Sequence, residues 1–276
     1  MLDRIDSDLL KEKLNQIKAD NYAIHDSENI LPIAFSMMQY IGCVDPELRD
    51  ELIYSTFLKW TVNRVFTAEQ MSQLLKISLD ESHLFYKIGE QNTDSVFTRT
   101  FSLLIIPLAF ELDSQTEFLT QEETIDIKNK VLQYLKLEKD IRGYVVGKGW
   151  AHSTAHAADA LDDIAKSRYM NHDELMEILH AIKSRVCIKN NTYINGEDDR
   201  MATAMMSVIK RNLIADNEIV KWIKSFGEIE KTGNYPEEHH LIMNAKNLLR
   251  SLYFQLLSQR NSNMFTEAIL ETLQKL

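Results

Sequence analysis

Glycine and proline are scarce in this chain, and that scarcity constrains the fold more than any other feature. There are eight glycines and four prolines among 276 residues, whereas average usage of the two together is about 12%. β-Sandwiches and barrels need frequent tight turns, which depend heavily on these two residue types. The count therefore favours a mostly helical protein, and periodicity and caps lead us to expect about 65–75% helix.

Helix start signals recur along the chain. Thr67 and Thr120 open capping-box patterns, with Gln70 and Glu123 three residues later. Between such starts, apolar residues recur at the helical period of 3.6. The pattern predicts helices over residues 4–19, 28–41, 46–65, 68–78, 81–89, 94–111, 121–137, 150–166, 172–189, 198–212, 216–227, 236–259 and 263–275.

Short turns join these helices, and no low-complexity linker separates them. Two helices with their turns take about 40–47 residues in HEAT and armadillo repeats. We therefore predict a single all-α domain over residues 1–276, built as a HEAT/armadillo-like α-solenoid of stacked helical hairpins. No repeat motif is legible in the sequence, so an irregular α-bundle is the alternative.

Charge and hydropathy restrict the partners. The formal net charge is −10, from 31 basic and 41 acidic residues. Nucleic-acid binders usually present a basic face, so this balance argues against nucleic acid, including base repair by a helical-repeat enzyme. The longest strongly apolar run, Leu103 to Phe110, is interrupted by Pro107 and is far shorter than the about 20 residues that span a membrane. The first residues lack the pattern of a signal peptide. We expect a soluble, cytoplasmic protein without a membrane partner.

The strongest chemical signal lies in the predicted helix 150–166. On a helix, His152, His156, Asp159 and Asp163 fall within an arc of about 60° and form a polar ladder. Trp150 falls on the opposite, apolar arc, so we expect its side chain to be mostly buried.

The ladder has three interpretations. It can be a solvated face whose histidine–carboxylate pairs add little stability. It can be a metal site, with His152, His156 and Asp159 holding zinc, manganese or iron. It can also be a polar ligand pocket without metal. Ser153 follows His152 where His-Glu-x-x-His proteases carry glutamate, so that protease class is excluded.

The ladder lies within a segment that resembles a bacterial family known as domain of unknown function 2785. The resemblance covers roughly residues 94–255 and rests on four motifs: Gly149-Trp150-x-His152-x-x-Ala155-His156-x-Ala158-Asp159-x-Leu161, Ser95-Val96-Phe97-x-Arg99-x-Phe101-Ser102, Asp140-x-Arg142-Gly143 and Glu197-Asp198-x-Arg200-Met201-Ala202. It implies an all-helical fold and a shared polar site, and it names no reaction.

In a stack of hairpins, one helix of each pair lines the inner surface, where polar stripes of successive helices would meet. For each arginine, a salt bridge between adjacent repeats is the alternative. The predicted ligand-binding residues are Arg99, His152, His156, Asp159, Glu197, Arg200 and Asn247.

The favoured function is a binding protein whose polar concave groove takes a peptide, a protein segment or a small polar ligand. The alternative is a divalent-metal-dependent hydrolase with His152, His156 and Asp159 as metal ligands and Glu197 or Asp198 as the base. The sequence leaves open whether any reaction is catalysed.

Overall fold

The structure is a computed structural model, and it describes residues 6–24, 30–257 and 263–276. It is 68% helix with a single two-stranded sheet among the described residues, so the all-α class and the expected helix content are confirmed. The elements in chain order are α1 (Ser7–Ala19), α2 (Leu31–Gln39), the π-helix η1 (Glu47–Tyr54), α3 (Ser55–Val62), α4 (Ala68–Ser78), α5 (Ser95–Leu103), α6 (Ile105–Thr116), α7 (Gln121–Leu137), β1 (Tyr144–Val145), β2 (Gly149–Trp150), α8 (Ser153–Lys166), α9 (His172–Val186), α10 (Glu197–Lys210), α11 (Asp216–Lys224), the 3-10 helix η2 (Ser225–Glu228), α12 (Glu237–Leu257) and α13 (Asn263–Lys275).

The contacts divide the chain into two compact units, Met1–Ala160 and Leu161–Leu276. We expected a single domain. The division falls inside α8, where Leu161 and Ile164 continue the same buried apolar stripe. No composition shift marks such a boundary, because the helix runs through it.

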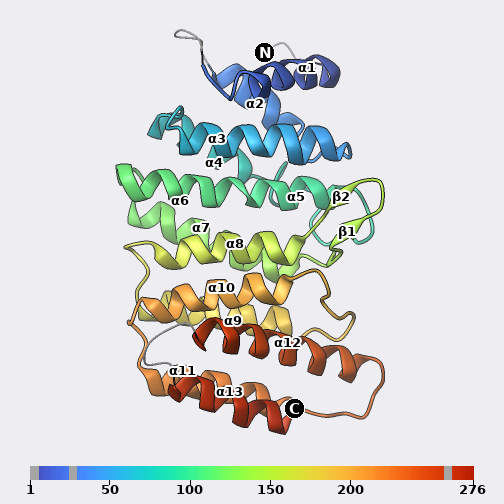
Figure 1. Cartoon of the computed structure of the whole chain (residues 1–276), viewed down its shortest axis with the longest axis vertical. Coiled ribbons are helices and arrows are strands. Elements are labelled where there is room, and N and C mark those ends of the chain that lie inside the picture. The colour runs from blue at the N-terminus through green and yellow to red at the C-terminus, as the bar shows by residue number, and fades with distance from the viewer. Residues whose placement is uncertain (1–5, 25–29, 258–262) are drawn as a thin grey trace. The chain divides into compact units, whose positions relative to one another are not determined.

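In the first unit, helices that are two apart in the chain pack side by side. α2 packs against α4, α4 against α6, and α1 against η1 and α3. Figure 1 shows these helices lying roughly parallel in successive layers. Their apolar stripes supply a core that includes the fully buried side chains of Leu14, Phe57, Trp60 and Phe97.

The second unit follows the same rule. α10 packs against α12, and α11 packs against α13. The buried side chains of these helices include Leu248 and Leu252 of α12 and Trp222 of α11. The long α12 therefore has one face on α10 and α13, and this leaves another face for solvent.

Several helix boundaries match the sequence patterns, and the exceptions have physical causes. The helices at 68–78, 121–137 and 263–275 have the predicted bounds. The predicted helix 94–111 is interrupted at Leu104, one turn before Pro107, because proline has no N–H to donate to the carbonyl of Leu103. Three predicted helices extend beyond the described residues, at residues 4–5, 28–29 and 258–259.

The predicted helix 81–89 is wrong, because the structure has consecutive turns there. Its apolar residues Leu84 and Phe85 are buried as a helical pattern requires. Its backbone carbonyls go elsewhere: those of Tyr86 and Lys87 accept hydrogen bonds from the guanidinium of Arg99, at 3.0 and 3.3 Å. Arg99, 13 residues after Tyr86, thus binds carbonyls that a continuing helix would use, while short turn bonds such as Tyr86 N–H to the His83 carbonyl at 3.1 Å hold the rest of the segment.

One stretch is long and apolar enough to cross a membrane by length and composition. It covers Ser95–Thr116, and 83% of its apolar window is buried inside the structure. α5 and α6 pack on each other, and α6 packs on α3 and α4. The stretch is accounted for as core helices of the first unit.

Candidate functional site

The glycine-rich segment before the ladder forms a β-hairpin. Tyr144 pairs with Trp150, and Val145 pairs with Gly149. Gly147 makes the turn with a φ of +76°, and no atom lies within 4 Å of where its Cβ would be. Gly149 has a φ of +80° and lies against η1, where a Cβ would stand 2.9 Å from Arg49 Nη2 and 3.1 Å from Asp50 Oδ2. The group that leaves no room for a Cβ at Gly149 is therefore η1 of the same chain.

Trp150 is 40% exposed, so the prediction that it is mostly buried is wrong. α8 begins at Ser153, and Trp150 belongs to β2 instead of the helix. The indole stacks on the His152 imidazole with ring centroids 4.3 Å apart and an interplanar angle of 23°. Tyr144, which is 56% exposed, meets the indole edge-on at 5.1 Å. The result is a short aromatic surface on the hairpin.

His152 lies just before the helix, so the ladder does not begin there. Its φ is +47°, a left-handed conformation that is uncommon for residues other than glycine. Its carbonyl accepts the hydrogen bond of the His156 N–H at 3.0 Å, which makes His152 the residue that caps α8. The helical spacing holds only for His156, Asp159 and Asp163.

His156 lies beneath His152 and is only 9% exposed. Its Nδ1 is 3.2 Å from the carbonyl oxygen of Thr100. Its ring meets Phe101 edge-on at 5.3 Å and His152 at 5.8 Å. Asp159, one turn on, is half-buried. His156 therefore supports the His152 ring from below and does not face solvent.

The metal interpretation finds no support in this arrangement. Among the described residues, which include His152, His156 and Asp159, no group of three or more His, Cys, Asp or Glu side chains could hold a metal ion. The proposed zinc, manganese or iron ligands are therefore not brought together as a set, and no step of a metal-dependent hydrolysis can be derived.

A buried arginine holds the hairpin on η1. Arg49 is fully buried and lies over the rings of Phe97 and Phe101, with its guanidinium carbon 4.2 and 4.6 Å from their centroids. It donates hydrogen bonds to the carbonyl oxygens of Cys43 at 2.7 Å and Lys148 at 2.6 Å. Nothing in the sequence pattern singles out Arg49, because the predicted helix 46–65 that contains it carries no polar stripe pointing to a site.

Asp50 accompanies this arginine. Its Oδ1 is 2.8 Å from Arg49 Nε, in contact but without the geometry of a hydrogen bond. Burial raises the pKa of the Asp50 carboxyl, and the Arg49 charge only partly offsets that effect. Burial also raises the pKa of the nearby Cys43 thiol to about 11, so this thiol is protonated and a poor nucleophile at neutral pH.

Arg99 does not line a groove. Its side chain and that of Glu138 have no exposed surface, and Arg99 Nε lies 2.6 Å from Glu138 Oε2. The guanidinium also donates to Ser95 Oγ at 2.8 Å. For Arg99 the structure shows a buried salt bridge, the kind of contact that the sequence left open as the alternative for each arginine; that the bridge joins adjacent repeats stays a prediction. Glu138 joins the end of α7 to α5 through it.

In the second unit, the remaining predicted residues separate into buried and exposed members. Glu197 is 2% exposed, and its Oε2 accepts the Asn195 N–H at 2.8 Å, so it is a buried residue of the α10 start. Arg200 is exposed. Asn247 is half-buried and lines a pocket between α10 and α12. Asn244 is buried, and it holds the preceding loop by accepting the Tyr193 N–H at 2.9 Å.

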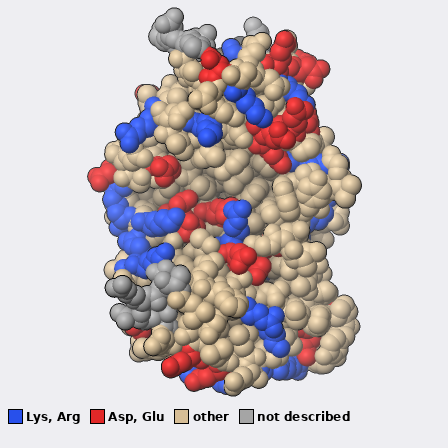
Figure 2. Space-filling model, viewed as in Figure 1, with Lys and Arg blue, Asp and Glu red and all other residues tan. Residues whose placement is uncertain are grey.

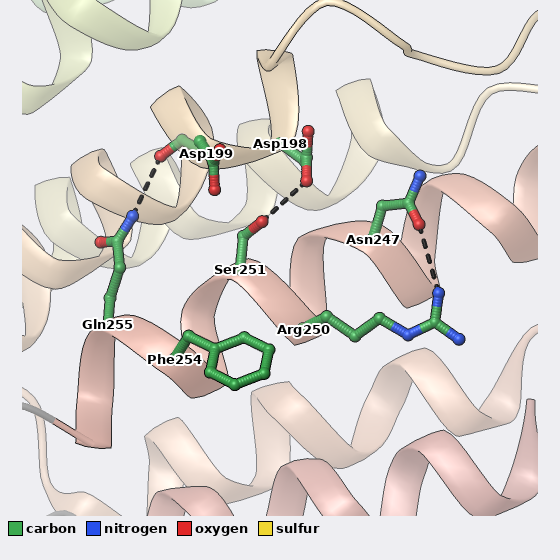
Figure 3. Close-up of a pocket in the computed structure, with 7 residues that line it drawn as sticks. All are labelled: Asp198, Asp199, Asn247, Arg250, Ser251, Phe254 and Gln255. Atoms are coloured by element: carbon green, nitrogen blue, oxygen red, sulfur yellow. Dashed lines mark hydrogen bonds between the residues drawn. The ribbon is translucent and has the colours of Figure 1, made fainter.

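The pocket has a volume of about 440 Å³. Figure 3 shows α10 contributing two carboxylates to one wall and α12 contributing the other wall. The residues that line it are Asp198, Asp199, Asn247, Arg250, Ser251, Phe254 and Gln255. Ser251 Oγ donates to Asp198 Oδ2 at 2.7 Å, and Gln255 Nε2 donates to the Asp199 carbonyl at 3.2 Å. These two bonds hold the walls of the pocket together.

Comparison with known proteins gives one family match. The model of the family described as "protein of unknown function (DUF2785)" matches residues 84–254, well over half of the chain. The chain belongs to the DUF2785 family. No curated protein and no solved structure matches it.

The DUF2785 segment contains the hairpin and all the residues that line the pocket except Gln255. The suspected resemblance, which we placed at residues 94–255, is thus confirmed with an earlier start. Its signature residues divide by role: Ala155 and Ala158 are buried, Gly149 packs on η1, and Trp150 reaches the surface. Of the ring-bearing residues in the signature, Trp150 and His152 are therefore the ones available to a ligand.

Proposed function

We propose that this DUF2785 protein is a binding protein that uses the Trp150–His152 surface to take a peptide or protein segment. The architecture we propose for it is a HEAT/armadillo-like stack of helical hairpins. The packing of helices two apart in the chain, within each unit, supports that stack, and such repeats commonly serve as binding surfaces.

The observation that carries the proposal is the exposed indole stacked on a backbone-strained histidine. Other positive-φ residues, such as Arg64, Glu117 and Asn212, follow the ends of helices, where a left-handed residue is an ordinary cap. His152 instead caps the start of α8 through its carbonyl. At the starts of α4, α7 and α9 the capping residues Thr67, Thr120 and Asn171 have extended backbones, so the left-handed backbone of His152 is not the usual one for a residue that caps a helix start. Strained conformations persist only where the surroundings enforce them, and they are frequent at ligand sites.

The surroundings favour a polypeptide over a small molecule. Tyr144 and Val146 are 56% and 90% exposed and lie on the same hairpin as Trp150. Figure 1 shows this hairpin standing beyond the end of α5. Exposed tryptophan and tyrosine are the side chains that contribute most to protein–protein affinity. An apolar side chain of the partner would lie against the indole and imidazole rings.

The test uses the exposure of the three tryptophans. Trp60 and Trp222 are 0% and 5% exposed, so a change in tryptophan fluorescence when a peptide binds at the surface reports on Trp150. The full chain is screened against an array of random synthetic peptides, and retained peptides are titrated into the parent while tryptophan fluorescence is followed. Because Trp150→Ala removes that reporter, the affinities of parent and variants are compared by the fluorescence anisotropy of fluorescein-labelled copies of the same peptides. We expect Trp150→Ala to weaken these peptides about 30-fold or more, as for an interface hot spot.

The matched control is Tyr235→Ala, which removes a 73% exposed aromatic side chain from the second unit. It should leave the retained peptides unaffected. Circular dichroism verifies that both variants keep the helix content of the parent. Equal retention by Trp150→Ala and the parent would refute the assignment, as would an array that retains no peptide.

A further inference from the structure

The pocket between α10 and α12 holds two opposite charges that are not paired with each other. Asp199 is an exposed residue at the start of α10, and Arg250 is an exposed residue on α12. Within the described parts of the chain, neither side chain forms an ion pair, and the Arg250 guanidinium donates a long hydrogen bond to Asn247 Oδ1 at 3.4 Å. Elsewhere in this unit, surface charges do pair, as Lys224 does with Glu271 at 2.7 Å.

The two charges belong to opposite walls. Asp198 and Asp199 come from α10, and Arg250 comes from α12 (Figure 3). The Ser251–Asp198 bond of 2.7 Å fixes the separation of these helices. Because the walls are held in place, a ligand does not have to assemble them, and less binding energy is lost to ordering.

An aromatic ring completes the pocket. Phe254 lies one turn after Arg250 on α12 and is 70% exposed. A ring that is left this accessible beside charged groups gives an apolar contact for the non-polar part of a ligand.

We propose that this pocket binds a small zwitterion of the amino-acid class, with an ammonium group, a carboxylate and an apolar side chain. The ammonium lies at Asp198 and Asp199, the carboxylate meets the Arg250 guanidinium, which suits bidentate recognition, and the side chain covers Phe254. A simple cation would be repelled by Arg250, and a simple anion would be repelled by the two aspartates. The volume of about 440 Å³ lies within the range of small-molecule sites.

The experiment compares three groups of probes on the full chain by isothermal titration calorimetry. L-Phenylalanine and L-leucine carry both charges, phenethylamine lacks the carboxylate, and 3-phenylpropionate lacks the ammonium. We expect at least one amino acid to bind, and each single-charge probe to bind about tenfold more weakly, the effect of losing one charge-assisted contact.

Variants assign each charge to its wall. Arg250→Gln should make the amino acid bind no better than phenethylamine, and Asp199→Asn should do the same relative to 3-phenylpropionate. Phe254→Ser should weaken the amino acids and both single-charge probes alike. Arg168→Gln and Asp216→Asn, which change exposed charges of the same unit outside the pocket lining, are the matched controls and should bind as the parent does.

Two results would overturn the proposal. One is the absence of binding by both amino acids. The other is binding of phenethylamine or 3-phenylpropionate as tight as that of the amino acids, which would make this a site for a single charge. The outcome is independent of the hairpin surface: Trp150→Ala should leave amino-acid binding unchanged, and Arg250→Gln should leave peptide binding unchanged.

Discussion

At the scale of single residues, two glycines of the hairpin have similar backbone angles and different surroundings. Gly147 and Gly149 have φ values of +76° and +80°. Open space surrounds Gly147, whereas the missing Cβ of Gly149 would contact Arg49, Pro46 and Asp50 at 2.9–3.1 Å. Gly149 therefore lets the hairpin approach η1, and that approach positions Trp150.

Alanine at these two positions separates the two effects. Gly147→Ala should cost about 1 kcal/mol of unfolding free energy, because only the left-handed backbone is penalised. Gly149→Ala should cost about 2–4 kcal/mol, since overpacking against η1 adds to that penalty. Urea denaturation of both variants measures the difference. Equal losses would mean that the hairpin adjusts and that the close contact with η1 is unimportant.

At the scale of elements, several helix starts follow local signals, and the clearest departure, at residues 81–89, involves a contact from outside the segment. Thr67, Thr120 and Asn171 make the capping boxes of α4, α7 and α9. The segment 81–89 has the apolar pattern of a helix, yet its carbonyls are bound by Arg99. One buried ion pair thus decides the conformation of a segment, the position of α5 and the end of α7.

Removal of this arginine should therefore be costly. Arg99→Met leaves Glu138 buried without its partner, and we expect a loss of about 3–5 kcal/mol in unfolding free energy. The double variant Arg99→Met/Glu138→Leu should recover part of that loss, because no isolated charge remains. Arg200→Met, at an exposed site, should change stability by about 0.5 kcal/mol or less. A loss below about 1 kcal/mol for Arg99→Met would contradict the structural role.

At the scale of the whole molecule, the charge distribution indicates which partners are disfavoured. The net charge is −10. Figure 2 shows basic side chains grouped at the left edge of one face, with acidic side chains beside them. Phosphate binding draws on basic charge that acidic neighbours do not offset, so the acidic excess disfavours it.

We accordingly expect no binding to nucleic acid. Fluorescence anisotropy of labelled duplex DNA and single-stranded RNA at low salt should be unchanged by addition of the protein. Low salt is the stringent condition, because it strengthens every phosphate contact. Binding that weakens steeply as salt is added would show that a local basic site outweighs the net charge.

The sequence by itself determined the helical class, many of the helix limits and the family. These follow from local causes: the scarcity of turn residues, the caps of single helices and the apolar period, each legible within about twenty residues. It also identified the segment around Trp150 and His152 as the strongest chemical signal. The predicted helix start was wrong: the prediction began the helix at Trp150, whereas α8 begins at Ser153, so Trp150 and His152 lie outside the helix.

Only the tertiary structure decided which polar residues can meet a ligand. Arg99 and Glu197 are of residue types that are common in binding sites, but their side chains are buried. The Trp150 side chain was expected to be mostly buried and lies at the surface. Asp199 and Arg250 are 51 positions apart in the sequence and line one pocket because α10 packs on α12. Burial and pairing depend on contacts between distant segments, and a periodicity within one helix carries no information about them.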